Sequence, residues 1–141
     1  IDDYMELAAV SELNMHFVNS HFMHPDDLLD EDRGAALGWE KLRARLDEYM
    51  TWMNESAPSL RNLTGSELAG AVQRYGALTV DKEITDQEIR IHLGNFYDEA
   101  YLMVRINDGT PGQVTGGELT NVTGNLYLLH AQEREVVIER N

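Results

Sequence analysis

The hydrophobic pattern of this chain changes its period near Gly76, and this change limits the possible folds more than any other feature. Before Gly76, apolar residues recur at three- and four-residue steps, which is typical of amphipathic helices. After it, apolar residues alternate with polar ones, which is typical of short strands. We therefore expect an α+β protein, with residues 1–77 mostly helical and residues 78–141 an antiparallel, β-sandwich-like module.

Three helices are predicted in residues 1–77. A short one runs from Tyr4 to Leu13 and ends near Asn14. A longer one stops before Pro58 and carries one apolar stripe, made of Trp39, Leu42, Leu46, Tyr49, Met50 and Met53. The stripe favours core packing for Trp39.

The third helix is announced by a capping box. The hydroxyl of Thr64 and the carboxylate of Glu67 can each accept a hydrogen bond from the other's free backbone N–H. We expect its buried face to consist of Leu68, Val72 and Tyr75.

One strand is predicted among the helices. The segment from Met15 to Met23 is rich in aromatic and β-branched residues, and Pro25 cannot continue a strand ladder. Alternation along this strand would place His16 and His24 on one face and His21 on the other.

Five or six short strands are predicted after residue 77. Their alternating apolar residues are Leu78 and Val80; Ile89, Ile91 and Leu93; Leu102, Val104 and Ile106; Leu126 and Leu128; and Val136 and Ile138. The tripeptide from Asn107 to Gly109 is a hairpin signal, and the one from Thr115 to Gly117 is a second turn. These turns favour local, antiparallel pairing.

Composition excludes several classes of partner. With 141 residues, 43% hydrophobic and 26% charged, the chain has the profile of a soluble globular protein. Its formal charge of −14 argues against nucleic acid, because nucleic-acid affinity depends on lysine and arginine. No apolar run approaches the ~20 residues of a membrane-spanning helix. The absence of cysteine is compatible with the cytoplasm or with an extracytoplasmic bacterial space, and of the two we expect the latter.

The strongest candidate for chemistry is His24 with Asp26 and Asp27. A histidine at the end of a strand, followed by an acidic loop, has the layout that barrel enzymes use for catalytic groups. Imidazole exchanges protons near neutral pH, so His24 could act as a general acid or base. The alternative is that His24 only caps the strand and that the aspartates solvate a turn.

These features together resemble a known family. The resemblance lies in the strand ending in His-Pro-Asp-Asp at residues 24–27, the helix starting at Gly38-Trp39-Glu40, and the module with Gly-Asn-Leu-Tyr-Leu at residues 124–128. The sequence resembles the C-terminal part of bacterial polysaccharide deacetylase-like proteins, such as those of Pel-type exopolysaccharide systems. The start at Ile1, with acidic residues where a signal peptide has basic ones, also favours a piece of a larger protein.

The resemblance implies a deformed (β/α) barrel that deacetylates amino sugars with a divalent metal. It implies that His24 protonates the departing amine, with the upstream barrel of the parent protein as its partner. The family's metal-binding His-x-x-x-His is absent from this sequence. We therefore expect no metal or other cofactor in this chain and no activity from it alone.

Two other groups could bind ligands. His16, His21 and His24 cannot easily converge on one metal if they lie on opposite faces of a strand. Aromatic residues could contact sugar, and our candidates are Trp52 and Tyr97, the latter in a loop beside Asp98. The alternative for Tyr97 is a hydrophobic plug. Two functions remain open: the end of a polysaccharide deacetylase, or a non-catalytic accessory module that binds glycan or a protein partner.

Overall fold

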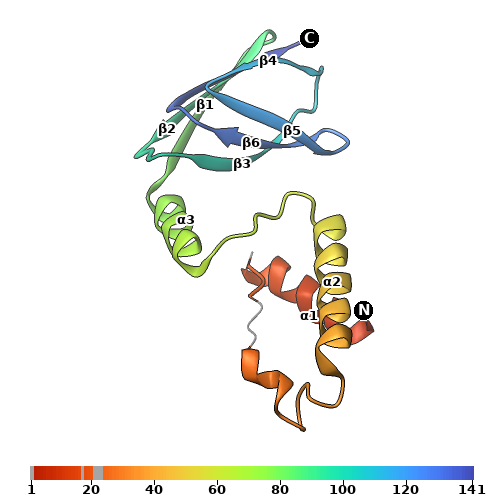
Figure 1. Cartoon of the computed structure of the whole chain (residues 1–141). Coiled ribbons are helices and arrows are strands. Elements are labelled where there is room, and N and C mark those ends of the chain that lie inside the picture. Colours follow the sequence, from red (N-terminus) through yellow and green to blue (C-terminus); the bar gives the residue numbers. More distant parts are fainter. Residues whose placement is uncertain (1, 17, 21–23) are drawn as a thin grey trace. The chain divides into compact units, whose positions relative to one another are not determined.

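A computed structural model describes residues 2–16, 18–20 and 24–141 of the chain. These residues form two compact units, residues 1–58 and residues 59–141 (Figure 1). The α+β prediction is confirmed, since helices come first and two antiparallel sheets follow. Among the described residues no helix is long and apolar enough to cross a membrane.

The described residues of the first unit form two α-helices and a short 3-10 helix. Helix α1 covers Asp3–His16, η1 covers Pro25–Leu28 and α2 covers Gly38–Ser56. The strand predicted from residue 15 to 23 is wrong where the structure describes it: Met15 ends up inside α1, and residues 18–20 have no regular secondary structure. The rest of that prediction, at residues 17 and 21–23, lies outside the described residues. Aromatic and β-branched content alone therefore did not identify a strand, because α1 continues into the segment.

Helix α2 buries only part of its predicted stripe. Tyr49 and Met53 are buried, and Leu42 and Leu46 are half-buried. Trp39, in contrast, is 54% exposed, so the expectation that it packs in a core is wrong. Trp39 lies in the first turn of the helix, at the end of the stripe, and lines a groove.

Helix α3 covers Gly65–Ala77 and belongs to the second unit. The capping box is confirmed, because the Thr64 hydroxyl accepts the Glu67 N–H and the Glu67 carboxylate accepts the Thr64 N–H at 2.7 Å. The predicted buried face is wrong for Val72 and Tyr75, whereas Leu68 is half-buried. Val72 and Tyr75 are 58% and 83% exposed, while Ala71 and Arg74 are half-buried.

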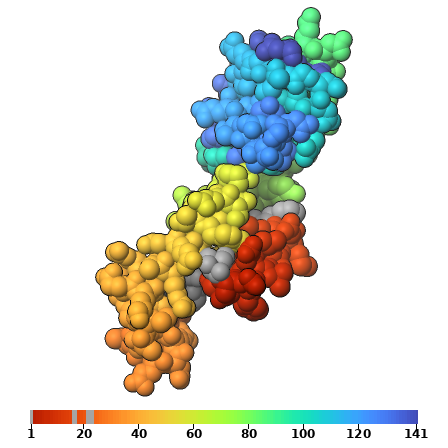
Figure 2. All heavy atoms as spheres, turned by 90° about the vertical axis from the view of Figure 1, so that its right-hand side faces the viewer, coloured from red at the N-terminus to blue at the C-terminus, as the bar shows by residue number. Residues whose placement is uncertain are grey.

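Seven strands make up the two sheets of the second unit. Their bounds are β1 Thr79–Ile84, β2 Glu88–Gly94, β3 Ala100–Arg105, β4 Pro111–Thr115, β5 Gly117–Thr123, β6 Leu126–Ala131 and β7 Glu135–Arg140. One sheet has the order β1-β2-β7-β4 and the other the order β3-β6-β5, and all pairs are antiparallel. The change from helix to strand thus falls where the change of period predicted it. In the space-filling view, the residues from cyan to blue pack side by side as one body (Figure 2).

The core of the second unit lies between the two sheets. It is made of Ile89, Ile91, Leu93, Ala100, Ile106, Leu129, Ala131, Val136 and Ile138. Most of these follow the predicted alternation, but β6 buries Leu129 and Ala131 fully, whereas Leu126 and Leu128 are only half-buried. The inward face of β6 is therefore the one opposite to the expected face.

The turn from Asn107 to Gly109 is not a hairpin. It connects β3 to β4, which belong to different sheets. Likewise, Gly116 joins β4 of one sheet to β5 of the other. Turn chemistry places the chain reversals correctly, but the pairing of the strands that flank them depends on packing across the whole unit.

Candidate functional site

His24 lies at the start of η1, in the first unit. Its backbone N–H donates to Oδ2 of Asp27 at 3.3 Å, so the carboxylate closes the first turn of η1. The imidazole is 51% exposed, and its Nδ1 lies 3.7 Å from Oδ1 of Asp26. The carboxylate of Asp26 therefore lies near the ring.

Asp27 is engaged elsewhere. Its Oδ1 lies 2.5 Å from Nη1 of Arg33, and its backbone carbonyl accepts the Gly34 N–H at 3.0 Å. The hydrogen bond from Arg33 and the one from the His24 backbone lower the pKa of the Asp27 carboxyl below its usual value. Asp27 thus folds the loop that follows η1, which is a structural task.

His24 also lines a groove in the first unit. The groove has a volume of about 590 Å³. Its walls are mostly apolar and include Leu28, Trp39, Leu42 and Leu46. An exposed imidazole in the lining of an apolar groove can form a hydrogen bond with a molecule bound there.

The other candidate residues of the first unit provide less evidence for a functional site. His21 lies outside the described residues, so the structure does not test the expectation that His16, His21 and His24 fail to converge on one metal. Among the described residues, no group of three or more His, Asp or Glu side chains is placed to hold a metal ion. Trp52, half-buried in α2, stacks on Tyr49 with ring centroids 6.4 Å apart.

The second unit carries a small pocket of about 90 Å³ beside Tyr97. Tyr97 is 74% exposed and lies in the loop between β2 and β3. Asn95 and Asp98 hold this loop in left-handed backbone conformations, with φ of 54° and 67°. The side chain of Asn95 donates to the carbonyl of Ala77 at 3.1 Å, which ties the loop to the end of α3.

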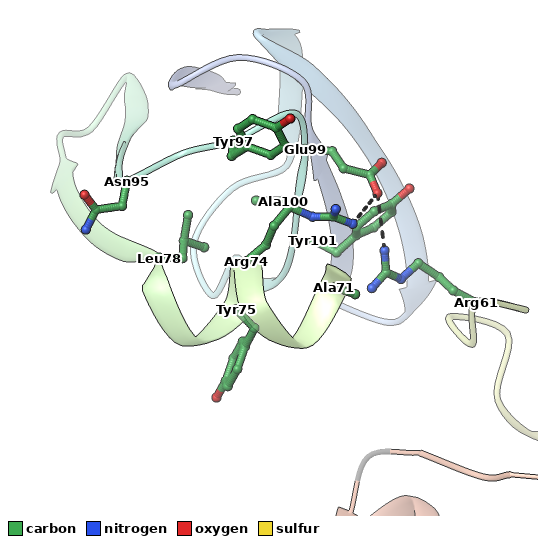
Figure 3. Close-up of a pocket in the computed structure, with 10 residues that line it drawn as sticks. All are labelled: Arg61, Ala71, Arg74, Tyr75, Leu78, Asn95, Tyr97, Glu99, Ala100 and Tyr101. Carbon is green, nitrogen blue, oxygen red and sulfur yellow. Dashed lines mark hydrogen bonds and ion pairs between the residues drawn. The ribbon is translucent and has the colours of Figure 1, made fainter. Parts of the chain in front are cut away.

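A polar cluster of Arg61, Arg74 and Glu99 lies in the lining of this pocket (Figure 3). Oε1 of Glu99 lies 3.3 Å from Nη2 of Arg74 and 3.7 Å from Nη1 of Arg61. Oε2 of Glu99 lies 2.9 Å from Nε2 of His130. The carboxylate of Glu99, the residue before β3, therefore joins helix α3, the segment before that helix and strand β6.

Tyr101 stacks between two of these groups. Tyr101 and His130 are directly opposite each other on β3 and β6, and their rings stack with centroids 4.3 Å apart. The guanidinium of Arg61 lies 3.9 Å from the centroid of the Tyr101 ring. Burial, reinforced by the charge of Glu99, raises the pKa of the Tyr101 hydroxyl.

Sequence reasoning identified Tyr97 but missed Arg61, Arg74, Glu99 and His130. The cluster joins residues that are 25 and 31 positions apart along the chain. The one local signal was Arg74, which shares a helix face with Ala71 and so could have been assigned to the side facing the sheets.

One family matches this chain. Residues 1–128 match the family described as "uncharacterised protein conserved in bacteria (DUF2194)". No curated protein and no solved structure gives a significant match. Since the family covers most of the chain, the protein is a member of the DUF2194 family.

Proposed function

We propose that residues 59–141 are a non-catalytic accessory unit that binds glycan. The observation that carries this proposal is the ring of Tyr97, which is 74% exposed beside a pocket lined by both apolar and polar side chains. An aromatic face exposed to this degree offers a surface on which the C–H groups of a sugar ring can pack.

The surroundings of Tyr97 support the same function. Asn95, Arg74 and Glu99 offer amide, guanidinium and carboxylate groups, which together can donate to and accept from sugar hydroxyls (Figure 3). Both Asn95 and Glu99 are held by other hydrogen bonds, so the site is largely formed before a ligand arrives.

The test is affinity electrophoresis of the full chain in gels that contain soluble polysaccharides, including partly deacetylated amino-sugar polymers. Retardation of the chain is expected, and Tyr97→Ala should abolish it. Tyr4→Ala is the matched control, because Tyr4 is similarly exposed at 79% but lies in the first unit. Equal retardation of the chain and of Tyr97→Ala would refute the role of Tyr97, and no retardation on any polymer would refute the function.

A second candidate function is the one that the sequence resemblance implies. In it, the chain is the C-terminal part of a polysaccharide deacetylase-like protein, located outside the cytoplasm, with His24 as the acid that protonates the leaving amine. It is supported by the place of His24 in the lining of a groove, with its Nδ1 3.7 Å from Oδ1 of Asp26. A metal would be held by the upstream barrel of the parent.

The test of this second function uses the parent protein that contains the barrel. Because a positioned proton donor contributes ~10²–10⁴-fold, His24→Ala should lower kcat by about that factor and leave KM within a few-fold. His92→Ala is the control, since His92 is a histidine exposed on β2. Full activity of His24→Ala with a lowered melting temperature would show that His24 is structural.

A further inference from the structure

The pocket beside Tyr97 has a surplus of positive charge in a very acidic chain. The chain has 25 acidic and 11 basic residues, apart from histidine. Yet among the residues that line the pocket, Arg61 and Arg74 face only one carboxylate, that of Glu99. A pocket that served only to hold the fold together would not need two guanidinium groups around one carboxylate.

Glu99 holds the two arginines in place but occupies only part of their hydrogen-bond donor capacity. The nitrogens that lie near the carboxylate are Nη1 of Arg61, at 3.7 Å, and Nη2 of Arg74, at 3.3 Å. A guanidinium carries five N–H donors, so most of the donor capacity of this pair remains for a ligand. Arg61 is also oriented by the ring of Tyr101, which lies 3.9 Å below it.

We propose that this pocket recognises the carboxylate of an acidic sugar, a uronate, in the glycan that the second unit binds. This inference rests on the proposed glycan-binding function and adds the chemical class of the ligand. A planar guanidinium pairs with a carboxylate through two parallel hydrogen bonds, which gives both affinity and orientation.

The size of the pocket agrees with this assignment. A volume of about 90 Å³ is well below the ~300–1,000 Å³ typical of pockets that enclose a whole ligand. It suits one substituent, with the sugar ring outside and against Tyr97. The aromatic ring then supplies affinity for sugar in general, and the arginines supply selectivity for the charged form.

The experiment compares each acidic polymer with its own carboxyl-reduced form, which keeps the linkages and rings but lacks the charge. The probes are polygalacturonate, alginate and hyaluronate, and binding to the full chain is measured by titration calorimetry at physiological salt. At least one acidic polymer should bind roughly tenfold or more tightly than its reduced form, as expected for charge-assisted hydrogen bonds. General attraction to polyanions cannot mimic this result, because the chain is itself strongly negative.

Three variants separate the pocket from the rest of the surface. Arg61→Gln should lose the preference for the acidic form. Glu99→Gln should strengthen it, because the carboxylate that competes for the arginines is gone. Arg90→Gln is the matched control: Arg90 pairs with Glu88 on β2, away from the pocket lining, and the preference should not change. Melting temperatures of all three confirm that the variants fold.

The outcomes distinguish this inference from the function on which it rests. If acidic and reduced polymers bind equally and Tyr97→Ala abolishes both, the unit binds glycan but the uronate assignment is wrong. If Arg90→Gln reduces the preference as much as Arg61→Gln, or if Glu99→Gln weakens it in a folded variant, the assignment is also wrong. If no polymer binds, the glycan-binding function itself is overturned.

Discussion

At the scale of single residues, Asp27 was identified from the sequence as a partner of His24, but its main partner is another residue. The acidic loop marked it as a partner of His24, and it does accept the backbone N–H of His24. Its stronger bond is with Arg33, which the sequence pattern did not single out. A run of aspartates does not reveal which of them forms an ion pair with a basic side chain, because the pairing depends on the path of the loop.

The ion pair of Asp27 predicts how the first unit responds to acid. The folded pKa of Asp27 lies below its unfolded value of about 3.9. The pair therefore stabilises the fold above that pH, and this contribution is lost as the pH falls through the folded pKa. Urea unfolding should show the loss of stability below about pH 4. Tryptophan fluorescence is the suitable probe, because both tryptophans lie within residues 1–58. Asp27→Asn should flatten the acid limb, whereas the exposed Asp47→Asn should leave its slope unchanged.

Two glycines with positive φ offer a matched pair of substitutions. Gly116 has φ of +81°, and a Cβ there would collide with the carbonyl oxygen of Glu135. Gly124 has φ of +52°, and a Cβ there would meet nothing within 4 Å. Gly124→Ala should cost only the strain of a left-handed backbone, about 1 kcal/mol, and Gly116→Ala roughly 1–3 kcal/mol more. Urea unfolding followed by circular dichroism measures both, and equal costs would contradict the crowded corner at Gly116.

At the scale of elements, the sequence predicts where helices and strands occur better than which face they bury. The capping box at Thr64 marked the start of α3 correctly because the signal is local. The buried face of β6 was misassigned because its sequence, LYLLHA, is apolar on both sides and alternation cannot select one. Leu129 and Ala131 are the fully buried residues because their face of β6 packs in the core between the two sheets.

Helix α3 should depend on its cap more than on burial. None of its residues is fully buried, and Val72 and Tyr75 are exposed. Thr64→Ala removes the acceptor of the Glu67 N–H and should cost about 1 kcal/mol. Hydrogen exchange should become faster in α3 while β2, β6 and β7 keep their protection. Ser66→Ala, a change of an exposed residue in the same turn, is the control, and protection lost equally in both variants would contradict the role of the cap.

At the scale of the whole molecule, the alternation of short strands predicted the sandwich, but the site depends on what the sandwich brings together. Tyr101 and His130 become neighbours only because β3 pairs with β6 in one particular register. Arg61 and Arg74 reach Glu99 from outside the sheets. Such a cluster follows from topology, so a single sequence could point to Tyr97 but not to the charges around it.

The described residues of the two units differ greatly in how much apolar surface they bury, and this predicts that the chain unfolds in two steps. Within the described part of residues 1–58, the buried hydrophobic residues are Ala9, Tyr49 and Met53. Residues 59–141 enclose a continuous core in which Leu129 is completely buried. Since burial of apolar surface is the main stabilising contribution, the first unit should unfold at lower urea than the second. Tryptophan fluorescence follows the first unit alone, while circular dichroism of the strands follows the second.

Two core substitutions test whether these steps are independent. Leu129→Ala should destabilise the second unit by about 2–5 kcal/mol and leave the tryptophan transition in place. Met53→Ala should do the reverse, lowering the tryptophan transition and leaving the strand signal unchanged. Each variant is thus the control for the other, because both remove a large buried side chain. A single transition in which the two signals coincide, shifted equally by both substitutions, would show that the chain folds as one cooperative unit.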